Sequence, residues 1–393
     1  MNTRRILLEL FDAALRAVDG RVTVRIALTA RIPNPVEVFA IGKAASAMTL
    51  GALDALESAI ENLLVITKDG HVDPELAKNS RARVIESAHP VPDARSLAGG
   101  DELMRRIAML RDDVYPLFLV SGGSSSLVES LREGVALADL RELNQRGLRM
   151  GWDIASFNAE RAKLSRLKGG GIAVQLAGRP ATALFISDVP GDHPDTIGSG
   201  LLGSRAGMED RVVRVVVANV DVAVRAAVAA GAARGLTLEA GKRRFDIDAA
   251  QVAKDFVEAL RATDADGLVW GGESTVTLPE QHGRGGRNTH VALHAAKLLR
   301  AGESLQILAA GTDGTDGPTS DAGAAVDSQT CERAEIAGVD VERALADFDS
   351  GTALEAAEDL VHTGPTGTNV GDILIGIKGS ATRVRGLSPT RVL

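Results

Sequence analysis

Three short apolar runs in this chain each end in a loop that is rich in glycine and polar side chains. The runs cover residues 117–120, 183–186 and 305–310, and the loops after them are Ser121-Gly122-Gly123-Ser124-Ser125-Ser126, Ser187-Asp188-Val189-Pro190-Gly191-Asp192 and Gly311-Thr312-Asp313-Gly314-Thr315-Asp316-Gly317. An apolar run of this length is typical of a strand buried on both faces of a parallel sheet. In open α/β sheets, ligands bind beyond the carboxyl ends of the strands. We therefore predict an α/β fold whose site lies at these loops.

Strand-like runs alternate with helical patterns along the chain, which predicts a mainly parallel sheet covered by helices. The first set of expected strands is 36–41, 62–67, 83–86, 115–120, 182–186 and 212–219, and the second is 267–270, 274–278, 305–310 and 372–377. A charged helical stretch at 246–264 separates the sets. Because 393 residues exceed one ordinary core, we predict two domains, residues 1–240 and 241–393.

Composition excludes several classes of function. A formal net charge of −8, with one Tyr and two Trp, provides no basic footprint and little base stacking for nucleic acid. The single cysteine, Cys331, excludes intramolecular disulfides and cysteine-based zinc sites, as suits a cytoplasmic protein. The N-terminal segment is predicted to be an amphipathic surface helix rather than a signal peptide, and charged residues interrupt the most apolar stretch, 212–233, so we expect no membrane span.

The segment Ile41-Gly42-Lys43-Ala44-Ala45-Ser46 has the pattern of a strand end, a glycine turn and a helix start. Lys43 would add a mobile positive charge to the dipole of the helix N-terminus, which suits a phosphoryl group. A surface lysine after a turn fits the same pattern.

The serine-rich loop offers glycines for close backbone approach and hydroxyls for hydrogen bonds. We expect it to hold a carboxylate or phosphates through Ser121, Gly122, Gly123, Ser124 and Ser125. It is neither a Walker A loop nor a nucleophile elbow, because it has neither spacing. A flexible surface turn is the alternative.

Asp188 and Asp192 lie four residues apart around a Pro-Gly bend. Neighbouring carboxylates repel one another unless a cation or a raised pKa relieves them, and Mg²⁺ prefers oxygen ligands. Asp188 could instead accept the proton of a substrate hydroxyl, with Asp192 or Asp316 near the metal. The alternative is a set of turn aspartates that cap local backbone.

The second half carries a possible phosphate clamp, since a guanidinium beside a glycine turn and a helix start can bind phosphate oxygens bidentately. The segments concerned are Gly272-Glu273-Ser274-Thr275 and Gly283-Arg284-Gly285-Gly286-Arg287-Asn288. Basic residues in 137–168 end at Lys168 before three glycines and could also meet an anion, although a solvated helix with a glycine cap is the alternative. We interpret His290 and His294 as helix surface rather than a zinc site.

Together these segments resemble the bacterial and archaeal glycerate 2-kinases, whose C-terminal half is the MOFRL domain; older usage names some of them hydroxypyruvate reductase. The resemblance covers about residues 41–377. It rests on Gly42-Lys43-Ala44-Ala45, His89-Pro90-Val91-Pro92-Asp93, Ser121-Gly122-Gly123-Ser124-Ser125, Leu164-Ser165-Arg166-Leu167-Lys168-Gly169-Gly170, Ser187-Asp188-Val189-Pro190-Gly191-Asp192, Gly271-Gly272-Glu273-Ser274-Thr275, Gly285-Gly286-Arg287-Asn288, Thr312-Asp313-Gly314-Thr315-Asp316-Gly317-Pro318 and Thr366-Gly367-Thr368-Asn369-Val370.

The resemblance implies a Rossmann-like, doubly wound N-terminal domain, a smaller α/β MOFRL domain and an active site in the cleft between them. It implies ATP- and Mg²⁺-dependent phosphorylation of D-glycerate at its 2-hydroxyl. The family's active-site lysine and arginine fall on Lys43 and Arg287. We expect Asp188 to be the catalytic base, and the further contacts to substrate or phosphate to come from the serine-rich loop, Lys168, Glu273 and Asn369, with Asp192 and Asp316 at the metal.

Two departures from the family pattern leave the acceptor open. Where the family usually continues Ile197-Gly198-Ser199-Gly200 with Pro-Thr, this chain has Leu201-Leu202; where it has Gln-Glu after Gly-Gly-Arg-Asn, this chain has Thr289-His290. A related sugar acid is therefore an alternative acceptor. An NAD(P)H-dependent hydroxypyruvate reductase is a further alternative, but no Gly-x-Gly-x-x-Gly opens a helix after a strand. The partners expected are small molecules, without nucleic acid or membrane, and a homodimer is the candidate assembly.

Overall fold

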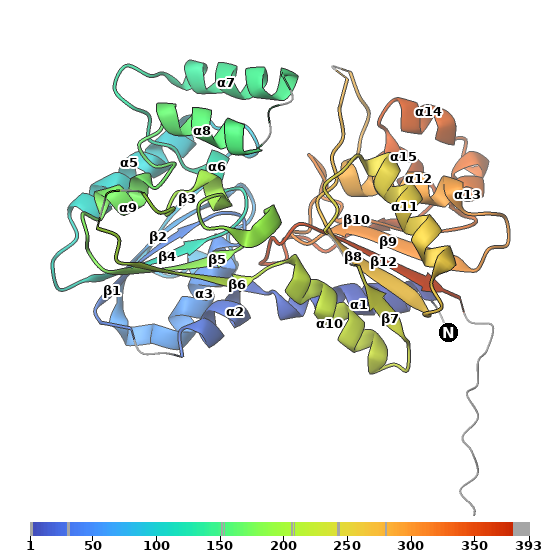
Figure 1. Ribbon diagram of the computed structural model, residues 1–393, viewed down its shortest axis with the longest axis horizontal. Helices are drawn as coiled ribbons and strands as arrows, with labels where there is room; N and C mark the ends of the chain where they lie inside the picture. The colour runs from blue at the N-terminus through green and yellow to red at the C-terminus, as the bar shows by residue number, and fades with distance from the viewer. Residues whose placement is uncertain are drawn as a thin grey trace, which may run out of the picture.

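The protein contains two six-stranded sheets that lie side by side, each with helices on both faces (Figure 1). The computed structural model describes residues 3–29, 32–150, 152, 154–205, 207, 209–241, 244–279 and 281–379. The first sheet comes from the N-terminal half of the chain and the second from the C-terminal half.

The first sheet is entirely parallel, as predicted, and its strand order is β3-β2-β1-β4-β5-β6. The strands are β1 (Val36–Ile41), β2 (Ile60–Lys68), β3 (Ala82–Ser87), β4 (Tyr115–Val120), β5 (Ala181–Ile186) and β6 (Val212–Ala218). This is the order of a doubly wound Rossmann sheet, in which ligands bind where the strand order reverses. Here the reversal falls between β1 and β4, so the loops after these strands border the crevice.

The second sheet is mixed, and the expectation of a mainly parallel sheet is wrong for it. Its order is β11-β10-β9-β12-β8-β7, with strands β7 (Leu238–Ala240), β8 (Gly267–Gly272), β9 (Leu305–Gly311), β10 (Gly323–Asp327), β11 (Leu360–Val361) and β12 (Asp372–Lys378). Only β7 and β8 pair in parallel, because β12 runs antiparallel to both of its neighbours. Helices cover both faces of this sheet, so its strands are as continuously apolar as those of a parallel sheet.

The sequence pattern also misplaced individual strands. The stretch 274–278 is not a strand, since β8 ends at Gly272 and Thr275 forms only an isolated bridge with Asp248. Alternating Ser, Thr and Val residues imitate the period of a strand, but no neighbouring strand pairs with them. The short strands β7, β10 and β11 were not predicted.

Helices pack on both faces of each sheet. Those of the first half are α2 (Gly20–Ala27), α3 (Ala45–Leu56), α4 (Pro74–Ala77), α5 (Ala94–Ala108), α6 (Ser124–Leu127), α7 (Leu137–Arg149), α8 (Ile154–Leu164) and α9 (Gly171–Gln175), with 3₁₀ turns η1 (Glu57–Ala59), η2 (Pro190–Asp192) and η3 (Ile197–Ser199). Those above the second sheet are α11 (Ala249–Ala262), α12 (Arg287–Leu298), α13 (Thr330–Ile336), α14 (Val341–Ala346) and α15 (Ser350–Ala356). The charged stretch predicted at 246–264 is confirmed as α11.

Two helices from the N-terminal part of the chain lie under the second sheet. They are α1 (Thr3–Ala17) and α10 (Val220–Ala232), seen below β8 and β12 in Figure 1. One continuous apolar core runs beneath both sheets and includes Leu119 of β4 and Ile375 of β12. The predicted domain boundary near residue 240 thus separates the strands of the first sheet from most of those of the second along the chain. That it divides the chain into two independent domains stays a prediction.

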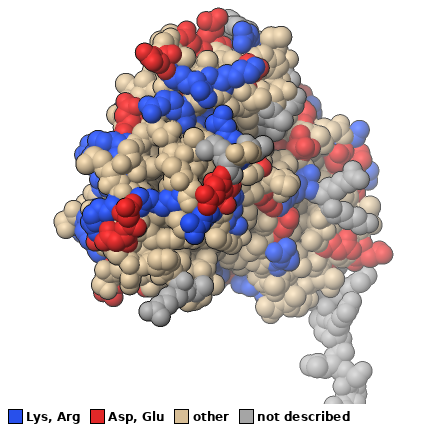
Figure 2. All heavy atoms as spheres, turned by 60° about the vertical axis from the view of Figure 1, so that its left-hand side comes forward, with Lys and Arg blue, Asp and Glu red and all other residues tan. Residues whose placement is uncertain are grey.

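The surface of the first half carries intermixed charge. Figure 2 shows basic and acidic side chains lying next to one another. The first half also contains exposed ion pairs, among them Arg95–Asp69 and Arg105–Glu102. Among the described residues, no helix is both long and apolar enough to cross a bilayer.

Candidate active site

A pocket of about 690 Å³ opens between the two sheets, at the ends of their strands. It is lined by residues of both halves: Lys43, Lys68, His89, Pro90, Gly123, Asp188, Glu273, Val276, Leu278, His282, Gly285, Gly286, Arg287, His290, Asp313, Thr315, Asp316, Gly317, Pro318, Thr319, Phe348, Ser350, Asn369, Gly371 and Asp372. Its size is that of a site for a small-molecule ligand or cofactor. The structure therefore brings together predicted residues that are up to 326 positions apart, from Lys43 to Asn369.

Lys43 reaches the pocket because the loops after β1 and β4 pack closely together. The Lys43 N–H donates to the Gly122 carbonyl (3.0 Å), and the Ala44 N–H donates to Ser121 Oγ (3.0 Å). Gly42 has φ +129°, and a Cβ there would lie 2.2 Å from Ser121 Oγ. Only glycine tolerates both constraints, so Gly42 and Ser121 set the position of Lys43 at the mouth of the crevice.

Lys43 also connects the two halves of the protein. Its Nζ lies 2.5 Å from Asp313 Oδ2, in the loop after β9, and both side chains are largely buried. Burial raises the pKa of Asp313, but the Lys43 ammonium and the Thr315 donors outweigh it and bring that pKa to about 2. Asp313 is therefore ionised at neutral pH and holds Lys43 in the pocket.

A second lysine extends this positive wall, and a neutral histidine lies near both lysines. Lys68, the last residue of β2, lies 3.5 Å from Thr315 Oγ1. Burial, followed by the charge of Lys43, lowers the pKa of Lys68. Burial and the same two lysines lower the pKa of His89 to about 3, so the imidazole is neutral at physiological pH.

Asp188 lies at the end of β5, facing the second half of the chain. It accepts a hydrogen bond from Asn369 Nδ2 (3.0 Å). A Cβ on Gly122 would lie 1.9 Å from Asp188 Oδ2, so glycine at 122 makes room for this carboxylate. Burial, with the charge of Glu273, raises the pKa of Asp188 to about 7 against the opposing effect of Lys43. A carboxylate with such a pKa is suited to general-base chemistry near neutral pH.

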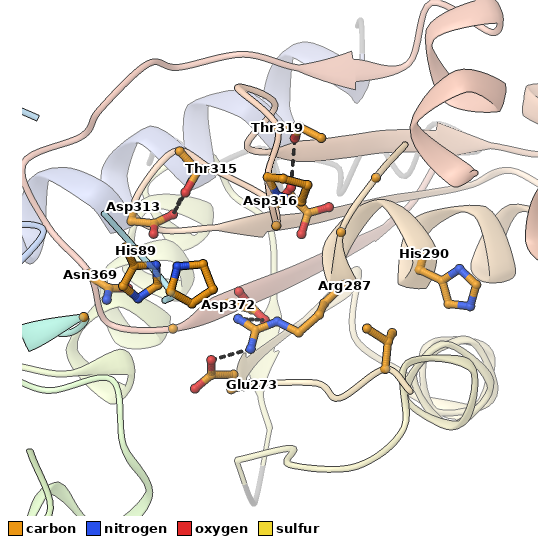
Figure 3. A pocket seen from close by; sticks show the side chains of 18 of the residues that line it. His89, Glu273, Arg287, His290, Asp313, Thr315, Asp316, Thr319, Asn369 and Asp372 are labelled. Carbon is orange, nitrogen blue, oxygen red and sulfur yellow. Dashed lines mark hydrogen bonds and ion pairs between the residues drawn. The ribbon is translucent and has the colours of Figure 1, made fainter. Parts of the chain in front are cut away.

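Arg287 begins α12 and enters the pocket from the opposite wall. Its guanidinium forms a short ion pair with Glu273 and lies 3.4 Å from Asp372 Oδ2 (Figure 3). Burial opposes its charge, but Asp372 and Glu273 outweigh this and raise the pKa of Arg287. Burial and Glu273 raise the pKa of Asp372 to about 6 despite Arg287. Arg287 thus remains charged and faces a pair of carboxylates.

Asp316, a predicted metal ligand, lines the pocket but is occupied by the protein itself. Its carboxylate accepts the backbone N–H groups of Asn288 (2.9 Å) and Thr289 (2.8 Å) and the Thr289 hydroxyl (2.8 Å). It therefore caps the N-terminus of α12 from another loop, which fixes the start of the helix that carries Arg287.

The serine-rich loop contributes backbone rather than hydroxyls to the pocket. Of its predicted residues only Gly123 lines the pocket, with φ +84°. Ser121 is buried against Ala44, Ser124 Oγ is buried, and Ser125 Oγ lies 2.9 Å from Ser199 Oγ. The structure places these side chains behind the pocket, where they support the Lys43 loop.

Asp192, the other predicted metal ligand, lies outside the pocket. Its Oδ2 accepts from Arg244 Nη2 (2.6 Å) and Asn219 Nδ2 (2.8 Å), so the Arg244 guanidinium already neutralises it. The structure does not bring Asp192 together with Asp188, because the Pro-Gly bend turns the two carboxylates apart.

Lys168 also lies outside the pocket, fully buried in the first half. It forms a short ion pair with Glu129, and the two side chains are 1% and 0% exposed. The Glu129 carboxylate also accepts from Ser165 Oγ and the Ser130 N–H. The structure therefore favours a structural role for Lys168 over the predicted contact with an anion.

Removal of this buried lysine should destabilise the fold. We expect Lys168→Met to lower the free energy of unfolding by about 3 kcal/mol, because it leaves the Glu129 carboxylate buried without its counter-ion. Urea unfolding followed by circular dichroism measures the effect. The double variant Lys168→Met/Glu129→Gln should recover most of the loss; a double variant no more stable than the single one would contradict this account.

Several pocket residues were not predicted as site residues, notably Lys68, His290 and Asp372. Lys68 could have been found, since it directly follows the predicted strand 62–67, much as Gly42-Lys43 follows the predicted strand 36–41. Asp372 was hidden by the assumption of a parallel sheet: β12 runs antiparallel, so its first residue pairs with Gly272 and Gly311 at the last positions of β8 and β9. His290 was placed on a helix surface, and that interpretation is wrong, because the side chain is buried.

The carboxylates of the pocket are compatible with a phosphate-bound Mg²⁺. Within the described ranges, no group of three or more His, Cys, Asp or Glu residues forms a metal cage. Mg²⁺ usually binds through one or two carboxylates together with substrate phosphates, so a cage is not required. Asp372 Oδ2 is buried and receives no hydrogen bond from any described residue, and Glu273 is half exposed. These two residues fit the ion better than Asp192 or Asp316.

The crevice lies at the reversal point of a doubly wound sheet and is lined by lysines, an arginine and carboxylates. This combination of fold and site is that of a two-domain kinase that phosphorylates small molecules. Residues 6–230 match a domain of unknown function, DUF4147, and residues 266–372 match the MOFRL family. The chain belongs to the glycerate 2-kinase family with a C-terminal MOFRL domain.

Relatives of known name agree over nearly the whole chain. The D-glycerate 2-kinase of Thermotoga maritima is 30% identical, with 96% of this chain and 98% of the relative covered. The glycerate 2-kinase of Pyrococcus horikoshii is 31% identical with the same coverages, and an Agrobacterium vitis protein with the provisional name hydroxypyruvate reductase is 33% identical, covering 95% and 94%. The crystal structure of the Thermotoga maritima glycerate kinase matches with a TM-score of 0.82 at 29% identity, covering 96% and 99%. The predicted fold class and family are thus confirmed.

Proposed function

We propose that this protein transfers the γ-phosphoryl group of ATP to the 2-hydroxyl of D-glycerate, giving 2-phospho-D-glycerate and ADP. The observation that carries the proposal is the convergence of Lys43, Asp188 and Arg287 on one pocket from opposite halves of the protein. Kinases act mainly by positioning and by neutralising phosphate charge, and these residues supply both. The names of the relatives support the same reaction and acceptor.

In this mechanism the two walls of the pocket have different tasks. Lys43 and Lys68 on one wall and Arg287 on the other neutralise the triphosphate. Asp188 accepts the proton of the acceptor hydroxyl as the oxygen bonds to the γ-phosphorus and the bond to the ADP oxygen breaks. Glu273 and Asp372 would hold Mg²⁺, which neutralises phosphate charge when bound. The backbone at Gly123 and the Asn369 amide, close to Asp188, are our candidates for holding the acceptor.

In the pocket, the Lys43 ammonium is paired with the Asp313 carboxylate. Phosphate oxygens that enter must compete with the Asp313 carboxylate for the Lys43 ammonium. We expect Asp313 to orient Lys43 toward the pocket until nucleotide arrives. A homodimer and a cytoplasmic location remain predictions.

The reaction is tested by incubating the protein with ATP, Mg²⁺ and D-glycerate and identifying the product by ³¹P NMR. We expect the signal of 2-phosphoglycerate. Formation of 3-phosphoglycerate would keep the kinase but overturn the proposed orientation of the acceptor. If no product forms, other sugar acids should be tried first, because Leu201 and His290 depart from the family pattern near the ligand loops.

The hydroxypyruvate reductase named among the relatives is the second candidate. It would require a dinucleotide site, whose usual glycine fingerprint the sequence lacks. Oxidation of NADH by hydroxypyruvate, at a rate that follows the purified protein, would favour it over the kinase.

A further inference from the structure

The pocket has two chemically different ends. One end carries Lys43, Lys68, Asp188 and Asp313, whereas the other is lined by apolar or aromatic side chains. His290 and Phe348 lie together at this second end, and the pocket lining also includes the apolar side chains of Val276, Leu278 and Pro318. Charged groups account for the triphosphate and the acceptor, but they leave this apolar end without a ligand.

Two flat rings form the centre of the apolar end. His290 and Phe348 stack with their ring centroids 4.8 Å apart and their planes 14° from parallel. Burial and the neighbouring His294 lower the pKa of His290 to about 4, so its ring is neutral. Phe, Trp and Tyr make up only 3% of the chain, so an aromatic ring at a pocket is uncommon in this protein.

Phe348 is held in an unfavourable backbone conformation. Its φ is +52°, in the left-handed region that bulky side chains avoid. Such strain persists where the surroundings fix the backbone, and it is concentrated at functional sites. Here the left-handed residue closes the C-terminus of α14, where the Asp349 N–H donates to the Ala344 carbonyl (2.7 Å). The flanking residues also contact the loop that leads to Arg287: the Asp347 carbonyl accepts the Gly283 N–H (2.8 Å), and Asp349 Oδ1 accepts the Arg284 N–H (2.7 Å).

The rings lie at a suitable place relative to the phosphate clamp. Arg287 and His290 are three residues apart on α12. Figure 3 shows the Arg287 side chain reaching toward Asp372 and Glu273, with His290 farther from these carboxylates than Arg287 is. A ligand with a charged chain and a planar ring could therefore extend from one end of the pocket to the other.

His290 also offers an unused hydrogen-bonding atom. Its Nδ1 is buried without a hydrogen-bond partner among the described residues, while its Nε2 lies 3.2 Å from His294 Nε2. An unpaired buried polar atom is costly, so it indicates a partner that the protein alone does not supply.

We infer that the apolar end of the pocket is the nucleobase subsite, in which Phe348 and His290 form the stacking platform. The inference rests on the proposed function only in placing the triphosphate at Lys43 and Arg287. It assigns the strained loop at Phe348 to nucleotide binding and the acceptor to the opposite end.

The test compares a nucleotide with a ligand that lacks the base. Stacking of a base on an aromatic ring contributes enough affinity that its loss weakens binding roughly tenfold. We expect Phe348→Ala to raise the dissociation constant for ATP, measured by calorimetry, roughly tenfold. Binding of inorganic tripolyphosphate and the KM for D-glycerate should stay within about twofold, because neither ligand has a base. Phe157→Ala, which removes a ring of α8 outside the pocket, serves as the control.

A second variant separates the effect of losing the ring from an effect on folding. Phe348→Gly removes the same ring and relieves the positive φ, so it should unfold at a higher temperature than Phe348→Ala while binding ATP equally weakly. Unchanged ATP binding in both variants, an equal loss of tripolyphosphate binding, or a rise confined to the KM for D-glycerate would each overturn the subsite. Because calorimetry needs no acceptor, a failed glycerate assay leaves this result interpretable.

Discussion

Replacement of Arg287 by alanine should lower kcat/KM for phosphoryl transfer by roughly a thousandfold or more, the loss found when an arginine that stabilises the transferring phosphoryl group is removed. The guanidinium is the positive charge of the second wall, and it is fixed by Glu273 and Asp372. A fixed charge in a partly desolvated pocket stabilises the transition state without reorganisation. Coupled detection of ADP with D-glycerate and saturating Mg²⁺ measures the effect.

The control for this variant is an arginine on the same half of the chain. Arg343 of α14 is 81% exposed and pairs only weakly with Asp347 at the surface, so Arg343→Ala should leave kcat/KM within about twofold. Arg287→Lys should recover only part of the rate, because an ammonium cannot bind two phosphate oxygens in a fork. Near-normal turnover of Arg287→Ala would show that the clamp assignment is wrong.

The second large effect is expected at the base. Asp188→Asn should lower kcat roughly 10²- to 10⁴-fold, since an amide cannot accept the proton of the acceptor hydroxyl. The substitution keeps the shape of the side chain and an oxygen for the Asn369 amide. The rate with saturating ATP and D-glycerate, determined by quenched time courses, measures the loss.

The same residue predicts the pH dependence of the enzyme. Burial and Glu273 raise the pKa of Asp188 to about 7, and the base acts only when ionised. In the wild type, kcat/KM should therefore fall about tenfold per pH unit below neutrality and level off above it, and the variant should lose this slope. Asp192→Asn is the matched control, because Asp192 belongs to the same loop but pairs with Arg244 outside the pocket. A slope that survives in Asp188→Asn would assign the titration to another group.

Much of the fold of the first half could be predicted, because local sequence patterns indicate its strands and loops. Strands β1, β4 and β5 are apolar runs, and the loops that follow them lie at the carboxyl edge of the sheet, where Lys43 and Asp188 line the pocket. The position of Asp372 could not be predicted, since it depends on the direction of β12, and buried antiparallel and parallel strands have the same apolar pattern.

Ion pairs between residues that are distant in sequence could not be predicted, and they affect two of the candidate site residues. Lys168 and Asp192 have the residue types of ligand contacts, but Glu129 and Arg244, far from them in sequence, neutralise them in the fold. The positive φ of Phe348 was likewise not predicted, because it occupies the left-handed position after α14 that is usually filled by glycine. The residue types thus predicted which side chains could bind a charged ligand. Which of them line the pocket depends on contacts with residues that are distant in sequence.

The packing of α1 has a consequence for how the protein is made. This helix is translated long before β10, β11 and β12, yet its Arg4 side chain donates to the carbonyls of Ala325 and Leu360, and its apolar face joins the core beneath β12. Leu7 and Leu10, which are fully buried in the folded protein, therefore stay without part of their packing until these strands have been made. During translation α1 thus exposes an apolar surface that a chaperone could bind until the second sheet forms.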